Sequence, residues 1–438
     1  MKKVFFICIT MILLLVGCGK NEENENQVET LVLASFSNDT SLMKQVEAFN
    51  QNHTDYKIEI KQYMRSEYVE EDGITQLQRE IVSENGPDII NFGYGYSITD
   101  IMGEYTENLY PYITKMAGEN DTEYFSNILE TFTYQEGLYA LPVNFTLKTY
   151  AGRSSVIGEQ ESWSIEELMD CFEREKAKSN GTLMLYPGET KKDVFGSIII
   201  GSIGNYVDWE KGTSRFTDDE FKRIMEFANQ FPDTLLISEG FSPMQCFANG
   251  ETLLCPVSLR NVYDICDAEM ILDEEVIYIG YPVNGNNGTV VEPGELTLAI
   301  SAGSEHKDIA WEFLSQFLTI EYQQDMTNGF PINKTAFVNQ LVLAQSIEYE
   351  MNSDGSQNPV TKSQIRFEGE EPIEIYQITK EQSDILLKLV EEASLGSAYD
   401  RTLHMILLEE VDSYFNGDKT VEETAEVMQG RTLAYIGE

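Results

Sequence analysis

The chain has 438 residues, of which 74 are acidic, 30 are basic and 3 are histidine, so its formal net charge is −44 at pH 7. Such a charge argues against nucleic acid as a partner, because neutralising phosphates requires clustered Lys and Arg side chains. The length exceeds what one ordinary hydrophobic core supports, so we expect two lobes.

The first 27 residues have the pattern of a signal peptide and a tether. Two lysines precede an almost wholly apolar run at 4–16, which is shorter than the ~20 apolar residues of a membrane-spanning helix but suits a secretory signal peptide. The run ends in Leu-Val-Gly-Cys, which resembles a bacterial lipobox and implies lipidation of Cys18; an ordinary signal peptide with an incidental cysteine is the alternative. We predict a signal peptide at 1–17, a tether at 18–27 and a lipid-anchored location on the extracellular face of the cell membrane.

Cysteine and histidine usage gives no sign of a metal or cofactor site. The histidines lie far apart and lack the spacing of metal ligands, so we expect no metal and no cofactor. Four cysteines remain beyond Cys18, and an exported protein could pair them in three ways between which the sequence does not choose. They are Cys171, Cys246, Cys255 and Cys266.

Beyond the tether, strand-like and helix-like patterns alternate, which is typical of α/β architecture. We expect strands at 30–36, 56–63 and 88–92, and helices at 42–49 and 75–83. The last strand, Asp-Ile-Ile-Asn-Phe, is apolar enough to be buried in a parallel sheet. Ligands bind such sheets at the carboxyl ends of the strands, so residues 36–39 and 93–96 are expected at the mouth of a site.

Short segments along the chain occur in the order of a known family. They include VEAFNQ at 46–51, GPDIINF at 86–92, ENLYPYI at 107–113, YALPVNF at 139–145, GELTLAISAG at 294–303 and GFPINKTAF at 329–337. The ordered set covers almost the whole mature chain. It resembles the family-1 extracellular solute-binding proteins of ABC importers, the group that includes maltose-binding protein.

The resemblance implies a periplasmic-binding-protein-like fold of type II, with two α/β lobes and a hinged cleft between them. The first lobe would hold 28–143 plus 290–330, and the second 144–289 plus 331–438. The resemblance further implies a monomer that captures a small solute, a mono- or oligosaccharide, and docks on the membrane subunits of an ABC permease. Neutral oligosaccharide is the leading case.

A sugar site requires aromatic faces for the C–H faces of the ring, together with amide, carboxylate or guanidinium groups for its hydroxyls. Phe36 ends the first expected strand and Asn38 follows it, and Tyr94 and Tyr96 follow the third. We take all four as candidate ligand-binding residues. Asn38 could instead cap the next helix, and the tyrosines could instead pack on the lobe surface.

Five further candidates lie later in the chain. Asn144 and Phe145 stand in the expected crossover between lobes, where a hinge residue and a core phenylalanine are the alternatives. Arg260 could bind a carboxylate or several hydroxyls, or form a surface salt bridge. Glu295 precedes the strand that returns to the first lobe and could also be an incidental surface carboxylate, and Tyr206 lies beside a Gly-Asn pair.

The function predicted from these features is solute capture for import and not catalysis. The sequence contains no G-x-S-x-G, no phosphate loop and no H-E-x-x-H motif. Two alternatives stay open: a secreted carbohydrate-active hydrolase that uses paired carboxylates, and a sensing lipoprotein of the same fold that does not transport. Trp163, Trp209 and Trp311 are expected to pack structurally and not to bind solute.

Overall fold

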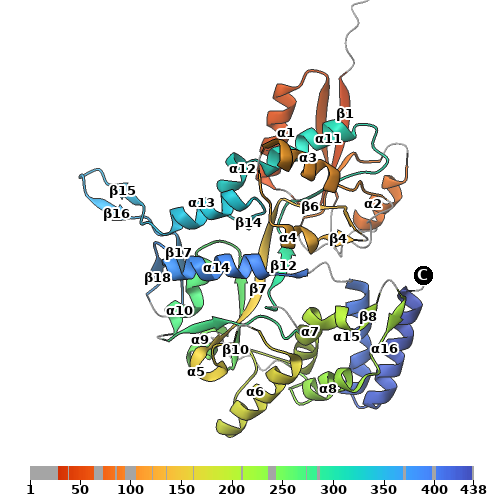
Figure 1. Ribbon diagram of the computed structural model, residues 1–438, viewed down its shortest axis with the longest axis vertical. Coiled ribbons are helices and arrows are strands. Elements are labelled where there is room, and N and C mark those ends of the chain that lie inside the picture. Colours follow the sequence, from red (N-terminus) through yellow and green to blue (C-terminus); the bar gives the residue numbers. More distant parts are fainter. Residues whose placement is uncertain are drawn as a thin grey trace, which may run out of the picture.

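The computed structural model describes residues 28–37, 39–63, 73–83, 86–93, 105–120, 122–134, 136–160, 162–208, 211–234, 243–272, 274–283, 287–367, 371–396 and 401–436. Two main sheets, each surrounded by helices, form the upper and lower parts of the molecule in Figure 1. The predicted two-lobed α/β class is therefore confirmed.

The first lobe is built on a sheet with the strand order β2-β1-β3-β13-β6. Strands β2 and β3 pair with β1 in parallel, whereas β13 runs antiparallel to both β3 and β6. The strands are β1 (Glu29–Ser35), β2 (Tyr56–Gln62), β3 (Ile89–Asn91), β6 (Leu141–Pro142) and β13 (Thr297–Ile300). Around them lie α1 (Thr40–Asn52), α2 (Gly73–Ile81), α3 (Tyr110–Asn120), α4 (Ser126–Glu130), α11 (Lys307–Ser315) and the hairpin of β4 (Thr133–Tyr134) and β5 (Gly137–Leu138).

Helix α1 illustrates why the sequence forms these elements where it does. Asp39 caps its first turn, since the side-chain oxygen accepts a hydrogen bond from Leu42 N at 2.6 Å. Leu42, Val46 and Phe49 recur at helical spacing and are all buried, so one face of the helix covers the sheet. The predicted helix at 42–49 is confirmed, with its start at Thr40.

The second lobe is organised around one long strand, β7 (Asn144–Arg153), which is buried over most of its length. Four strands pair antiparallel with β7, and a fifth pairs in parallel with β12. These are β10 (Leu254–Leu259), β11 (Val276–Tyr278), β12 (Val290–Pro293), β14 (Phe330–Pro331) and β19 (Leu395–Gly396). Its helices are α5 (Ser154–Ile157), α6 (Ile165–Lys178), α7 (Lys191–Ser202), α8 (Asp219–Ala228), α9 (Pro243–Ala248), α10 (Asp267–Ile271), α15 (Arg401–Phe415) and α16 (Val421–Ile436), with the hairpin of β8 (Val207–Asp208) and β9 (Thr213–Ser214) beside α16.

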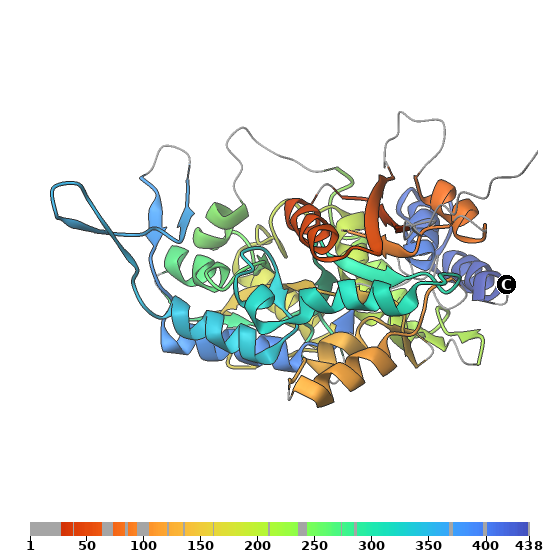
Figure 2. The ribbon, with the colours of Figure 1, turned by 90° about the horizontal axis from the view of Figure 1, so that it is seen from above.

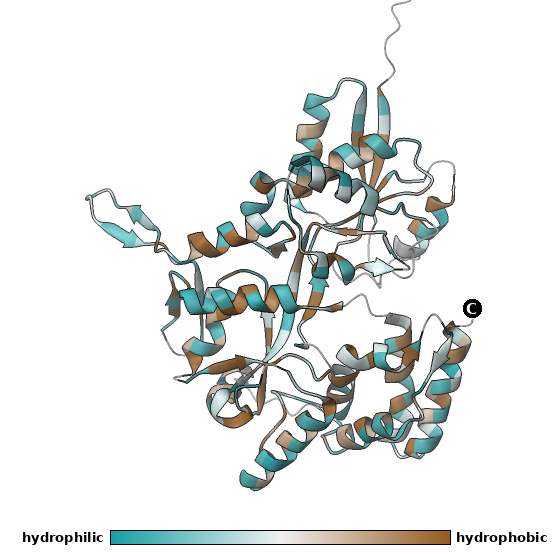
Figure 3. Ribbon diagram, viewed as in Figure 1, coloured by the Kyte–Doolittle hydropathy of each residue, from teal (hydrophilic) through white to brown (hydrophobic). Residues whose placement is uncertain are grey.

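Later segments of the chain connect the two lobes and extend beyond them. Helices α12 (Ile320–Gln324), α13 (Lys334–Ala344) and α14 (Lys380–Glu392) lie along one side of the molecule (Figure 1). Between α13 and α14 the chain forms β15 (Tyr349–Met351), β16 (Gln357–Pro359), β17 (Ser363–Ile365) and β18 (Ile373–Ile375). Figures 1 and 2 show the β15–β16 hairpin projecting away from the body, and Figure 3 shows that it is largely hydrophilic.

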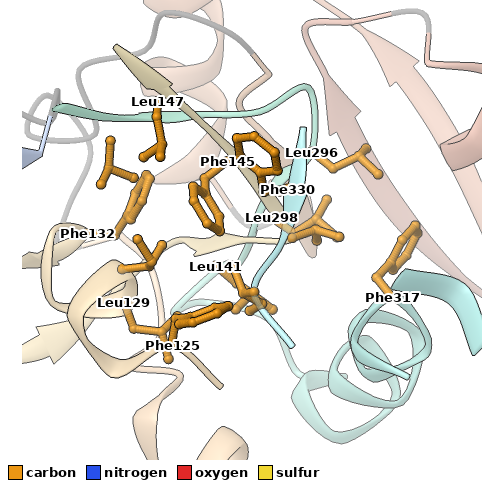
Figure 4. Close-up of a cluster of buried hydrophobic side chains, with 14 of the residues drawn as sticks. Phe125, Leu129, Phe132, Leu141, Phe145, Leu147, Leu296, Leu298, Phe317 and Phe330 are labelled. Carbon is orange, nitrogen blue, oxygen red and sulfur yellow. The ribbon is translucent and has the colours of Figure 1, made fainter. Parts of the chain in front are cut away.

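One hydrophobic cluster runs from the first sheet across the second, where it includes buried residues of β7, β10, β11 and β12. Figure 4 shows Phe145 and Leu147 of β7 in the same cluster as Leu141 and Leu298 of the first sheet. A second cluster fills the far end of the second lobe, where Trp163 is buried and donates from Nε1 to Gly280 O at 3.3 Å. The continuous first cluster means that the lobes share apolar packing at the place where the chain crosses between them.

The chain crosses between the sheets at neighbouring places. Strand β6 leads directly into β7, and β12 leads into β13; Val143 N donates to Leu296 O at 2.9 Å, which holds these crossings side by side. The sequence prediction places 290–293 in the first lobe, whereas as β12 these residues pair with β7. An apolar strand of this kind fits either sheet, so its pattern alone does not reveal its partner.

Candidate functional site

The carboxyl ends of β1 and β3 lie side by side, as the parallel pairing requires. Phe36 N donates to Asn91 O at 3.2 Å, and the buried Asn91 side chain donates to Ser37 Oγ at 3.0 Å. Asn91 Oδ1 also accepts from Gly93 N and from Thr297 N, each at 3.2 Å. The described parts of the two segments expected at the mouth of a site are therefore tied together by one buried amide.

A groove of about 760 Å³ opens beside this edge, where the first lobe meets the crossing segments. It is lined by the first turns of α1, by Asn144, by 295–296, by residues of 316–322 that include the start of α12, and by 325–328. This volume lies within the range of ~300–1,000 Å³ of small-molecule sites. Two of the predicted site residues, Asn144 and Glu295, thus line the same groove.

The wall between α1 and α12 carries a hydroxyl pair. Ser41 Oγ and Tyr322 OH lie 2.7 Å apart. Burial raises the pKa of Tyr322 to about 12, so its hydroxyl keeps its proton at physiological pH and can donate a hydrogen bond. The pair therefore presents uncharged donors and acceptors to the groove.

Carboxylates outnumber bases in the lining of the groove. Asp39, Glu295, Glu321 and Asp325 all lie there, together with Lys44. Ionised carboxylates only accept hydrogen bonds, which suits a solute rich in hydroxyl groups and disfavours one that is itself anionic. The groove can thus hold a neutral polyhydroxylated molecule through several hydrogen bonds.

Asn144 uses its side chain within the protein as well as lining the groove. Its Nδ2 donates to Asn328 O at 2.8 Å, and its Oδ1 lies 3.4 Å from Leu296 N, which donates to it. Arg260 lies next to the same segment, since its carbonyl oxygen accepts from Gly329 N at 2.7 Å, while its side chain is exposed. The structure therefore brings Asn144, Glu295 and the backbone of Arg260 to one region.

Two other predicted residues lie elsewhere. Phe145 is fully buried and its ring packs at 5.7 Å from that of Phe330, so the structure places it in the core and not on the groove (Figure 4). Tyr206 is also buried and packs on Phe216, beside a separate pocket of about 530 Å³ formed with the β8–β9 hairpin. Both rings are buried by apolar packing, which for Phe145 was the alternative considered from the sequence and for Tyr206 was not.

Some predictions fall on residues that lie outside the described part of the chain. These are Asn38, Tyr94, Tyr96, Trp209 and the lipid-anchor residue Cys18. The capping role considered for Asn38 is filled by Asp39, as described for α1.

Sequence reasoning missed a fully buried polar side chain near the groove that makes three hydrogen bonds. Gln323 is fully buried in α12; its Nε2 donates to Val143 O at 2.9 Å and to Phe317 O at 3.0 Å, and its Oε1 accepts from Asn333 N at 2.8 Å. Its neighbours form the sequence Glu-Tyr-Gln-Gln-Asp, a mostly polar pattern that predicts a solvent-exposed helix. No local signal distinguishes it from its neighbour Gln324.

The described cysteines are free thiols. Cys171, Cys246, Cys255 and Cys266 are all buried, and burial raises the pKa of Cys255 and that of Cys266 to about 12. Thiols with such pKa values are inert at physiological pH. In the same described ranges, no cluster of His, Cys, Asp and Glu side chains is arranged to bind a metal, and no helix is both long and apolar enough to span a bilayer.

Comparison with known proteins gives a family match and several fold neighbours. The family model of the bacterial extracellular solute-binding proteins matches residues 34–324. The sugar-binding protein MalE from Xanthomonas citri is 11% identical, with a TM-score of 0.58 and coverage of 93% of this chain and 97% of that one. An ABC substrate-binding protein from Listeria monocytogenes, in complex with cycloalternan, is 12% identical, with a TM-score of 0.55 and coverage of 94% and 100%.

A solute-binding protein of an ABC transporter from Thermotoga lettingae, bound with alpha-D-tagatose, is similar to the same degree. It is 12% identical, with a TM-score of 0.54 and coverage of 93% of this chain and 100% of that one. No curated protein matches the chain. At these identities the structural neighbours establish a shared fold, and the family model establishes the family.

Proposed function

Because this chain belongs to the bacterial extracellular solute-binding proteins, we propose that it captures a small carbohydrate in the groove and delivers it to an ABC import permease. The observation that carries the proposal is the groove itself, with its hydroxyl pair and carboxylates where the chain crosses between the two lobes. Neutral sugars fit this lining best, since the carboxylates repel anions. The sugars bound by the structural neighbours support the same choice.

Thermal unfolding of the purified full-length chain tests the proposal directly. The panel holds mono- and oligosaccharides, polyols, amino acids and short peptides. A ligand that binds only the folded state adds about 2.7 kcal/mol at a hundredfold excess over its dissociation constant, so it raises the melting temperature. We expect a neutral sugar to do so and to be recovered unchanged. A sugar recovered hydrolysed would support the hydrolase alternative, and a shift with amino acids or peptides alone would refute carbohydrate capture.

A matched pair of variants locates the binding event. Glu295→Gln removes a carboxylate from the groove, whereas Glu305→Gln makes the same change at an exposed position outside it. A hydrogen bond to a charged group contributes about 1.5–3 kcal/mol. We therefore expect roughly 10- to 100-fold weaker sugar binding for Glu295→Gln in calorimetric titration and unchanged binding for Glu305→Gln. Equal affinities for the two variants would place the sugar elsewhere.

The proposal includes a lipid anchor at Cys18, on the extracellular face of the cell membrane, and a monomeric state. A net charge of −44 supports the monomer, because copies of the chain repel one another. We expect the wild-type chain in the membrane fraction of expressing cells and Cys18→Ser outside it. A Cys18→Ser chain that stays membrane-bound would contradict anchoring through this residue.

A further inference from the structure

The side chain of Asn144 lies between three segments that are far apart in the sequence. Asn144 is the first residue of β7; its Oδ1 accepts from Leu296 N, and its Nδ2 donates to Asn328 O. Its backbone carbonyl also accepts from Gly294 N at 2.9 Å. One residue therefore ties the β6–β7 crossing to the β12–β13 crossing and to the loop that follows α12.

Two glycines leave room for this amide. A Cβ at Gly294 would lie 2.1 Å from Asn144 Oδ1, and a Cβ at Gly329 would lie 2.6 Å from Asn144 Nδ2. Real Cβ atoms do not approach other atoms so closely, so any side chain at either position must push the amide aside. Asn144, Gly294 and Gly329 thus form one fitted unit, which we name the crossing clamp.

We propose that Asn144 acts as a positioning residue through the crossing clamp, setting the angle between the lobes by holding the crossing segments together at one point. The clamp lies where β6 passes into β7 and β12 passes into β13, so a rotation of one lobe against the other must turn about it. Since Asn144 also lines the groove, the same residue connects solute capture with the angle between the lobes. This inference rests on the proposed function in one respect: it assumes that the lobes rotate when the solute is captured.

The test uses Gly294→Ala, because its Cβ displaces the Asn144 amide without any change at Asn144. Gly303→Ala is the matched control, since a Cβ there meets no atom within 4 Å, and neither glycine has a positive φ. We expect overpacking of this kind to lower the melting temperature of the full-length chain by about 3 °C. The control is expected to melt within about 1 °C of the wild type.

A lower melting temperature would also be expected if Asn144 only stabilised the fold, so a second measurement is required. Spin labels at the exposed positions Met43 on α1 and Lys178 on α6 report the distance between the lobes. We expect a broader distance distribution for Gly294→Ala and for Asn144→Ala, and the wild-type distribution for Gly303→Ala. Asn144→Ser, which also lacks the amide, replaces Asn144→Ala if that variant does not fold.

The double variant decides whether the two residues act as one unit. Asn144→Ala removes the three atoms that lie nearest to the added Cβ, so Gly294→Ala with Asn144→Ala should melt no lower than Asn144→Ala alone. Additive losses, or distance distributions that stay at the wild-type width, would overturn the proposal. None of these measurements uses a solute, so their outcome is independent of whether a sugar binds.

Discussion

The crossing region and the second lobe both bury polar side chains, but with groups of different chemistry. Near the groove the buried groups include the amides of Asn91, Asn144 and Gln323, which carry no charge at any pH. In the second lobe Glu189 is only 6% exposed, and it is a carboxyl group. The hydrogen bonds of the buried amides in the crossing region are therefore independent of pH, whereas those of Glu189 in the second lobe depend on pH.

The environment of Glu189 explains its titration. Burial raises its pKa to about 7, although hydrogen bonds from Leu185 N at 2.9 Å and Tyr186 N at 2.6 Å favour the ionised form. Lys176 lowers the pKa further, but not enough to offset burial. Gln323 makes a similar set of backbone contacts without any ionisation.

The largest effect is expected at Gln323. Replacement by Leu keeps the volume of the side chain but leaves the carbonyls of Val143 and Phe317 and the N–H of Asn333 without this partner. Each buried group left unpaired costs about 1–3 kcal/mol, so we expect Gln323→Leu to lower the free energy of unfolding by about 3 kcal/mol or more. Urea denaturation at pH 6 and pH 8 should give the same loss, since the amide does not titrate.

Gln324→Leu is the matched control for this comparison. Gln324 is the next residue of α12 and is half-buried, and we expect its replacement to change the free energy of unfolding by less than about 0.5 kcal/mol. Equal losses in the two variants would mean that the hydrogen bonds of Gln323 do not stabilise the crossing region. A loss at Gln323 that grew with pH would remove the distinction between the two regions.

The sequence predicted the parts of the fold that depend on local pattern. The strands near 30–36, 56–63 and 88–92 and the first two helices were readable because apolar periodicity and end signals coincide within a few residues. The sheet partner of 290–293 was not readable, because its valines suit either sheet. The length of the chain indicated two lobes, and the order of the family segments supplied their arrangement, which no local pattern contains.

The candidate site was only partly readable, for a similar reason. Asn144 and Glu295 were found because they flank the expected crossovers, and both line the groove. Gln323 and Tyr322 were missed because the roles of their side chains depend on segments distant in sequence, Val143 for one and Ser41 for the other. Phe145 was chosen for its place in the crossover, with a core phenylalanine as the alternative, and its buried ring packs against that of Phe330 as the alternative describes.

The smaller effect is expected at Glu189, and its sign follows from proton binding. The folded pKa of about 7 lies above the ordinary value of 4.5, so between these pH values the folded state binds more protons than the unfolded state. The contribution of Glu189 to the free energy of unfolding is therefore fully present below about pH 4.5 and is lost as the pH rises through 7. Between pH 5.5 and pH 8 this carboxyl group accounts for a loss of about 2 kcal/mol.

Glu189→Gln separates this contribution from that of the other acids. Burial also raises the pKa of Asp267 to about 6 and that of Glu269, so part of the decline with pH should remain in the variant. We expect urea denaturation across pH 5.5–8 to give a shallower decline for Glu189→Gln and the wild-type decline for Glu173→Gln, an exposed carboxyl group on α6. If the decline is the same in all three proteins, Glu189 is ionised in the folded state at pH 5.5. In that case the backbone hydrogen bonds lower the pKa of Glu189 by more than burial raises it. Glu189 and Gln323 would then differ in how much their hydrogen bonds stabilise the fold, and not in whether that stabilisation depends on pH.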